Sequence, residues 1–211
     1  MRKKVIQLPQ GYLSYSQIAL WKANKERYKS IYFDGRRDLR INNSGMAYGK
    51  VVATALEEEK DTGDLLTDSA MALLKQYDVK DKEIRAEIKT KEGWITVMGK
   101  PDTFNSKTHE FREFKTGKGK WTQGKAQKHI QMRMYAMLIY LKHGTVLSHA
   151  YLDWMETENT DMGIQPTGHV ESFRVELGIG AILEMMALAS SVAKEIEIAW
   201  ASHVPEPKLT F

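Results

Sequence analysis

The sequence predicts an α/β or α+β fold in which helices cover a mixed β-sheet. Hydrophobic residues recur with helical spacing in the first third of the chain and again over 123–142 and 178–201. Over 83–98 they alternate with polar residues, which is the pattern of half-buried strands. The segment over 123–142 is long enough to connect a third strand to a parallel fourth one, so we expect the sheet to be mixed.

Length and composition predict one globular unit. The chain has 211 residues, a net charge of +4, 42% hydrophobic residues and no cysteine, which favours a single domain over 1–211. The lack of cysteine excludes disulfide-stapled folds, iron–sulfur clusters and thiol nucleophiles. No hydrophobic run approaches the ~18 residues of a membrane span, and the first residues lack a signal-peptide core. We therefore expect a cytoplasmic protein without a membrane partner.

Three helices are expected in the N-terminal third. Ser14 and Gln17 make a capping box, which marks the start of the first helix. A polar stretch over 34–45 predicts an exposed loop. Hydrophobic residues with helical spacing place the three helices at about 14–28, 48–60 and 64–77.

Strands dominate the next part of the chain. Alternation over 83–90 and a hydrophobic run over 94–98 flank a turn at Glu92 and Gly93, which predicts a hairpin. A third strand over 109–115 is expected to extend it into a meander, covered by the helix over 123–142. The sequence then predicts a strand over 146–154, a weaker strand over 170–176 and a final helix over 178–201.

Two carboxylates and an amine are expected to converge where the second and third strands end. Asp102 follows the second strand, and Glu113 and Lys115 lie two residues apart on the third, so they share one face. Both carboxylates and the carbonyl of Phe114 suit Mg²⁺ or Mn²⁺, which could activate water and polarise a phosphate. Lys115 could then orient the water and stabilise the growing charge. Taken singly, each residue is more typical of a solvated strand end or an exposed ion pair.

The combination of three motifs is more specific than any one of them. A Gly-x-x-Asp motif ends at Asp102, a Glu-x-Lys motif runs from Glu113 to Lys115, and Gln131 and Tyr135 lie on one face of the next helix. Together they strongly resemble the PD-(D/E)XK nuclease superfamily, specifically its RecB-like exonuclease branch. A Leu-Ser-x-Ser start and a Gly-containing helix upstream extend the resemblance over about residues 13–135.

The resemblance implies a restriction-endonuclease-like core, with a mixed sheet flanked by helices. It also implies that Asp102 and Glu113 bind metal, that Lys115 is catalytic, and that Gln131 and Tyr135 line the DNA path.

The chain departs from this family pattern at Ala53, where many RecB-like nucleases have a metal-binding histidine. Glu57 lies one helical turn further on the same face and could supply a carboxylate to the metal instead. Glu58 is the alternative ligand, and an exposed acidic helix end explains both residues equally well.

A glycine-rich basic loop follows the predicted catalytic lysine. Its cations Lys118, Lys120 and Lys125 could neutralise phosphates of a DNA strand, and glycines let the backbone approach them closely. A flexible solvated loop is the alternative. The same loop nearly matches a nucleotide-binding P-loop, but Ala126 stands where that motif has its Ser or Thr.

These observations predict a Mg²⁺- or Mn²⁺-dependent deoxyribonuclease, and favour an exonuclease in recombination, repair or phage-type DNA processing. Its expected partner is DNA, as single strands or duplex ends, and a homo-oligomer or a recombination partner protein stays open. A structure-selective or restriction-like endonuclease would share the same metal core. Outside enzymes, the alternative is a non-catalytic DNA-binding subunit, which has no need for two mutually repelling carboxylates in one pocket.

Overall fold

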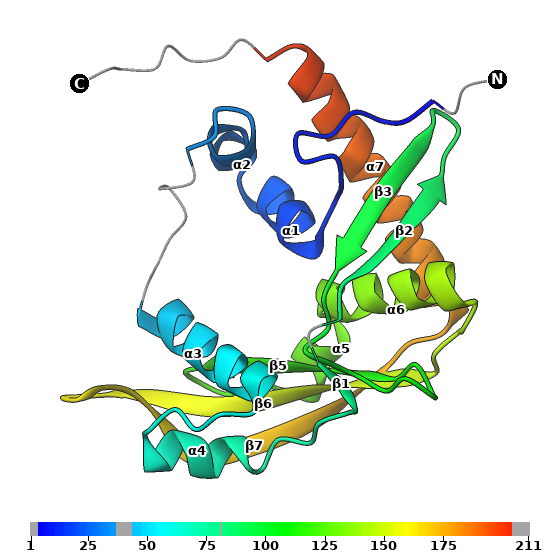
Figure 1. Ribbon diagram of the computed structural model, residues 1–211. Helices are drawn as coiled ribbons and strands as arrows, with labels where there is room; N and C mark the ends of the chain where they lie inside the picture. Colours follow the sequence, from blue (N-terminus) through cyan, green and yellow to red (C-terminus); the bar gives the residue numbers. More distant parts are fainter. Residues whose placement is uncertain (1–3, 37–43, 81, 204–211) are drawn as a thin grey trace, which may run out of the picture.

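The central feature of the fold is a mixed sheet. The computed structural model describes residues 4–36, 44–80 and 82–203 (Figure 1). In their spatial order, the strands of the sheet are β1 (Val79–Lys80), β4 (Thr103–Phe104), β5 (Phe111–Gly117), β6 (His149–Thr160) and β7 (Gly163–Glu176). β5 and β6 pair in parallel and the other neighbours are antiparallel. The predicted fold class, a mixed sheet flanked by helices, is thus confirmed.

Helices pack on both faces of this sheet. α5 (Gln123–Gln127) and α6 (Ile130–His143) connect β5 to β6, and α6 packs with α7 (Ile179–Ala201) in the main hydrophobic core. On the opposite face, α3 (Ser44–Glu58) and α4 (Leu65–Met71) form a smaller core. Neighbouring residues of β5 therefore contact different helices. In the described part of the chain, no helix is both long and apolar enough to cross a membrane.

The predicted three-stranded meander is wrong. β2 (Ile84–Lys89) and β3 (Trp94–Gly99) form a separate two-stranded sheet, and only the short strand β4 leads into β5. The reason is that the N-terminal segment occupies the other edge of β3. Leu13 N donates to Thr96 O and Met98 N donates to Leu13 O, both at 2.9 Å, so this edge of β3 is not available to β5.

The first predicted helix is two helices. α1 (Tyr15–Ala23) begins after Ser14, whose hydroxyl accepts a hydrogen bond from Gln17 N at 3.4 Å, as the capping box predicts. The helix ends at Asn24, which is extended and caps α2 (Lys25–Tyr32). Asparagine side chains compete for backbone hydrogen bonds, which explains the break at this residue.

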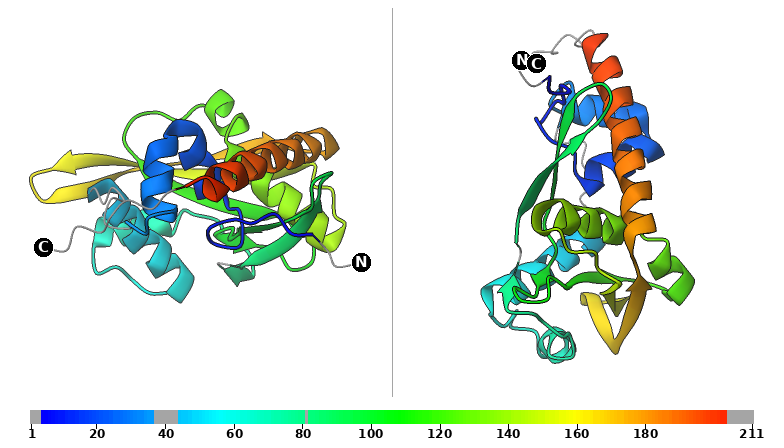
Figure 2. Two further views of the ribbon diagram at one scale, coloured as in Figure 1. Left: turned by 90° about the horizontal axis from the view of Figure 1, so that it is seen from above. Right: turned by 90° about the vertical axis from the view of Figure 1, so that its right-hand side faces the viewer.

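Other boundaries differ where tertiary packing, rather than local sequence, decides them. β6 and β7 extend well beyond 146–154 and 170–176 as a hairpin that projects from the rest of the sheet (Figures 1 and 2). Its outer part is largely exposed, so it lacks the hydrophobic alternation of the inner part. The third predicted helix ends early, at Met71, and residues 37–43 of the predicted loop lie outside the described residues.

A buried ion pair joins the central strands. Arg112 Nε and Nη2 donate to the two carboxylate oxygens of Asp153 at 2.7 and 2.6 Å, across the β5–β6 pair. Nη2 also donates to Ser172 Oγ on β7 at 2.8 Å. The two charged side chains are only 5% and 3% exposed. Removing one partner would leave an unpaired charge inside the protein, which costs far more than losing an exposed ion pair.

We therefore expect Asp153→Ala to lower the free energy of unfolding by about 3–5 kcal/mol. The double variant Arg112→Met/Asp153→Leu removes both charges and should recover most of this loss. Urea denaturation followed by circular dichroism measures both changes. A double variant no more stable than Asp153→Ala would contradict the view that the unpaired guanidinium causes the loss.

Candidate active site

The candidate site is built on β5, whose residues point alternately to its two faces. Glu113 Oε1 accepts hydrogen bonds from Lys115 Nζ and from Gln131 Nε2 on α6, each at 2.5 Å. Phe114 points the other way and packs against the α3–α4 core. Glu113 and Lys115 thus share one face, as the sequence predicts, and Phe114 anchors the strand between them.

Asp102 reaches this strand from the loop between β3 and β4. Its Oδ2 accepts a hydrogen bond from Phe114 N at 2.6 Å. β4 pairs with β5 only at Phe111 and Arg112, so the amide of Phe114 lies beyond the last residue of its neighbouring strand. In a strand the N–H and C=O of one residue face the same edge, so the Phe114 carbonyl faces the side where Asp102 lies.

Electrostatics at Glu113 are unfavourable for a carboxylate. Burial raises its pKa to about 8, the nearby Lys115 opposes this shift, and the charge of Asp102 adds to it. For Lys115, burial lowers the pKa, but attraction to Glu113 and Asp102 outweighs it and the pKa is raised. Without a bound cation, Lys115 is therefore charged at neutral pH and Glu113 tends to keep its proton.

One oxygen of this carboxyl group stands apart from the hydrogen bonds of the site. Glu113 Oε2 is buried and makes no hydrogen bond within the described residues. A buried oxygen without a partner is destabilising unless another group satisfies it. Glu113 Oε2, Asp102 and the Phe114 carbonyl make an all-oxygen donor set, which fits the preference of Mg²⁺ and Mn²⁺.

Gln131 and Tyr135 hold the site together rather than standing apart from it. Gln131 Nε2, besides contacting Glu113, donates to Tyr135 Oη at 2.7 Å, and Tyr135 Oη donates to Lys100 O at 2.8 Å. This chain of hydrogen bonds links α6 to β5 and to the loop that carries Asp102. Both side chains also line a large groove, so a contact with DNA stays a prediction.

Close approach of β3 to α6 makes this chain of hydrogen bonds geometrically possible. A Cβ added at Gly99 would lie 2.8 Å from both Leu138 Cδ1 and Tyr135 Cε1. Any larger residue would require the Leu138 and Tyr135 side chains to shift. The glycine of the Gly-x-x-Asp motif is thus required by packing next to Tyr135.

Glu57 lies near Asp102 but does not complete a three-residue metal site. Ala53 and Glu57 line a small cavity of about 50 Å³ together with Asp102 and Phe114. Glu58, the alternative ligand, instead pairs with Lys60 at 2.9 Å. Across residues 4–36, 44–80 and 82–203, no three His, Asp or Glu side chains are close enough to hold one metal ion. A direct role for Glu57 stays a prediction.

An open cleft gives access to these groups. It has a volume of about 570 Å³, and α3 forms one wall while β5 residues Glu113 to Gly117 form the other. α3 lies close to β5 at Gly49, where a Cβ would lie only 2.9 Å from Thr116 Oγ1. The cleft is therefore lined by Asp102, Glu113 and Lys115 and lies between a helix and a strand.

The basic loop after β5 is exposed, in keeping with either interpretation of it. Lys118 and Lys120 face solvent in this loop, whereas Lys125, predicted as part of it, is exposed on α5. Lys125 Nζ lies 4.2 Å from the centre of the Trp121 ring. Trp121 packs against the main core, so it is an anchor for this loop. The contact of these lysines with phosphates stays a prediction.

Two aromatic groups lie near Lys115, and one of them, Tyr15, was not predicted from the sequence. The ring of His129 lies 5.6 Å from that of Tyr15, and burial together with Lys115 and Lys125 lowers the pKa of His129 to about 4. Burial also raises the pKa of Tyr15, whose hydroxyl is close enough to Lys115 and Glu113 to be affected by both. Tyr15 follows the capping Ser14, and this position in the Leu-Ser-x-Ser motif was the signal that could have identified it.

Comparison with known proteins identifies a similar fold but no family. No protein-family model matches the chain, and no curated protein matches it. Among solved structures, a putative exonuclease from Eubacterium rectale has a TM-score of 0.59 at 10% identity, covering 95% of this chain and 91% of that one. The structure of a protein named SSO0001 has a TM-score of 0.49 at 10% identity, with 88% and 77% covered. At this identity the first likeness shows the fold alone.

The raised pKa of Glu113 predicts how stability varies with pH in the metal-free protein. The unfolded chain loses this proton near its ordinary pKa of 4.5, whereas the folded chain keeps it up to about 8. This contribution to stability is therefore complete below about pH 4.5 and is lost as the pH rises to about 8. We expect the difference in unfolding free energy between Glu113→Gln and the wild type to increase across this window.

Urea midpoints in EDTA at several pH values would measure this difference, with Glu58→Gln as the control. Glu58 is exposed and paired with Lys60, so its variant should follow the wild type. A Glu113→Gln curve parallel to the wild-type curve would show that the carboxyl group ionises normally.

Proposed function

We propose that this chain is a metal-dependent deoxyribonuclease, and specifically an exonuclease that hydrolyses phosphodiester bonds. The observation that carries the proposal is the buried Glu113 carboxyl group beside a second carboxylate and a lysine. One of its oxygens makes no hydrogen bond to any residue that the structure describes. This arrangement is costly in a protein without a ligand, because burial and like charge both oppose ionisation. A bound divalent cation would offset both the cost of burying the Glu113 carboxylate and its repulsion from Asp102.

The residues of the site have distinct roles in this proposal. Asp102, Glu113 and the Phe114 carbonyl would hold Mg²⁺ or Mn²⁺, which when bound supplies an acidic water and a Lewis acid for the phosphate. Lys115, charged and fixed by Glu113, would donate a hydrogen bond to the attacking water and stabilise negative charge on the phosphate oxygens. Gln131 would keep Glu113 Oε1 occupied, so that Oε2 is the oxygen that faces the cation.

Glu113 also argues against a non-catalytic scaffold. A DNA-binding subunit would gain nothing from an ionisable group whose burial raises its pKa to about 8. Perturbed carboxyl groups of this kind gather at functional sites. The choice of exonuclease over endonuclease has weaker support, namely the motif resemblance and a fold shared with a protein described as a putative exonuclease.

The test of the function compares linear and closed circular DNA, in single-stranded and duplex forms. An exonuclease should degrade end-labelled linear DNA in Mg²⁺ or Mn²⁺, leave circles intact, and be inactive in EDTA. Gel electrophoresis follows both substrates. Cleavage of circles would favour the endonuclease, and the lack of any hydrolysis with either metal would favour the non-catalytic subunit.

Variants should separate metal binding from later chemistry. We expect Asp102→Ala and Glu113→Ala to abolish cleavage and to weaken Mn²⁺ binding, because each removes a charged ligand. Lys115→Met should abolish cleavage but retain Mn²⁺, because the lysine acts on water and phosphate. Isothermal titration calorimetry with Mn²⁺ distinguishes the two classes.

Glu57→Gln extends this comparison to the residue whose role is open. A rate at least about 100-fold lower would assign Glu57 to the metal site.

Unchanged Mn²⁺ affinity in both Asp102→Ala and Glu113→Ala would overturn the ligand assignment, whatever happens to activity.

A further inference from the structure

A groove of about 920 Å³ extends from the candidate active site to α1 and α2. Gln131 and Tyr135 line it, and Gln131 is hydrogen-bonded to Glu113, so the groove and the site share a wall. The end of β3 and the loop at Lys100 form another part of the lining. The groove therefore borders the place where the proposed hydrolysis occurs, and Gln131 separates the two.

The chemistry of the groove is aromatic, amide-rich and positive. Tyrosines, side-chain amides and two cations line it, and none of its described lining residues is acidic. These groups are Tyr12, Tyr15, Tyr32 and Tyr135, then Gln10, Gln17, Asn24 and Gln131, and finally Arg27 and Lys100. Tyr12, Tyr15 and Tyr32 are partly exposed and offer rings for stacking, and the two cations suit phosphates. Tyr135, Gln17 and Gln131 are buried and hydrogen-bonded within the protein, so they shape the wall.

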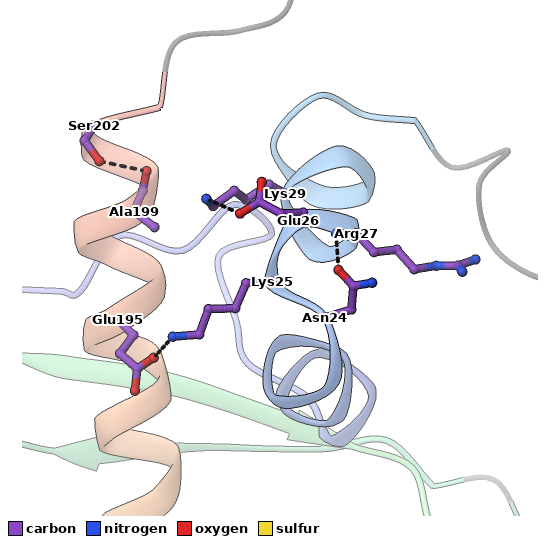
Figure 3. A network of polar contacts seen from close by, with 8 residues as sticks. All are labelled: Asn24, Lys25, Glu26, Arg27, Lys29, Glu195, Ala199 and Ser202. Carbon is purple, nitrogen blue, oxygen red and sulfur yellow. Dashed lines mark hydrogen bonds and ion pairs between the residues drawn. The ribbon is translucent and has the colours of Figure 1, made fainter.

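α2 places one of these cations, Arg27, on the side of the groove. Figure 3 shows Lys25 directed at Glu195 of α7, with Nζ and Oε2 2.6 Å apart, whereas Arg27 points away from α7. Asn24 fixes the start of the helix, because its Oδ1 accepts a hydrogen bond from Arg27 N at 2.9 Å. The same helix thus uses one cation to attach to α7 and presents another along the groove.

We infer that this groove binds single-stranded DNA and leads one strand to the site, an inference that rests on the proposed nuclease function. A duplex keeps its base faces stacked on one another and presents mainly phosphates. The groove has two lining cations and three partly exposed tyrosines, so much of its capacity for binding lies in stacking on exposed bases. Tyr15 lines the groove on the α1 side, where its ring would stack on a base of the bound strand.

The experiment measures binding without turnover, by fluorescence anisotropy in EDTA. The probes are a labelled ten-nucleotide thymidine oligomer and a hairpin duplex of ten base pairs. The single strand should bind more tightly. Tyr15→Leu should weaken its binding about tenfold, whereas Tyr15→Phe, which keeps the ring, should bind like the wild type.

A salt series tests the cation with a matched control. Arg27→Met should reduce the slope of log affinity against log salt by about 0.7 for the single strand, because one phosphate contact is lost. Lys29→Met removes the same charge from α2 outside the groove lining, where Lys29 pairs with Glu26 at 2.8 Å, and should leave the slope unchanged. Circular dichroism verifies that both variants are folded.

The two possible failures can be told apart. Tighter binding of the duplex, or equal slopes for Arg27→Met and the wild type, would overturn the groove inference even if the protein hydrolyses DNA. Single-strand binding that depends on Arg27 and Tyr15, combined with no hydrolysis in Mg²⁺ or Mn²⁺, would uphold the groove and overturn the nuclease proposal.

Discussion

The candidate site depends on one hydrogen bond, from Phe114 N to Asp102 Oδ2. β4 is only two residues long, so β5 loses its antiparallel neighbour after Arg112. A backbone amide at that position needs an acceptor, because buried polar groups without partners are costly. Asp102 supplies it, and by doing so brings a second carboxylate beside Glu113. The early end of a short strand thus organises the acidic pair.

The alternation of side chains along β5 separates stability from chemistry. Arg112 points to one face, where it is neutralised by Asp153 and contributes to cohesion of the sheet. Glu113 points to the other face, where Lys115 and Gln131 satisfy only one of its oxygens. Two adjacent ionisable residues are therefore buried to similar extents, yet one is fully paired and the other has an oxygen without a hydrogen-bond partner among the described residues. This contrast distinguishes a structural charge from a candidate functional one.

The sequence predicts those features that depend on neighbouring residues alone, such as the face of a strand or the cap of a helix. Glu113 and Lys115 share a face because they are two residues apart in a strand, and Ser14 caps α1 because its hydroxyl lies near Gln17 N. The separate β2–β3 sheet could not be predicted, because it depends on Leu13 pairing with β3 across a long sequence separation. The groove escaped prediction for the same reason. Tyr12 and Arg27 join Lys100 and Gln131 only through tertiary packing.

The attachment of α1 and α2 to α7 has a consequence for the shape of the groove. Glu195 Oε2 accepts hydrogen bonds from Trp21 Nε1 of α1 at 3.0 Å and from Lys25 Nζ of α2 at 2.6 Å. One carboxylate of α7 therefore binds both helices. α7 in turn packs on α6, the helix that carries Gln131 and Tyr135. α7 therefore fixes the distance between α1 and α2 on one side of the groove and α6 on the other. It sets the width of the groove, although it contributes no residue to the described lining.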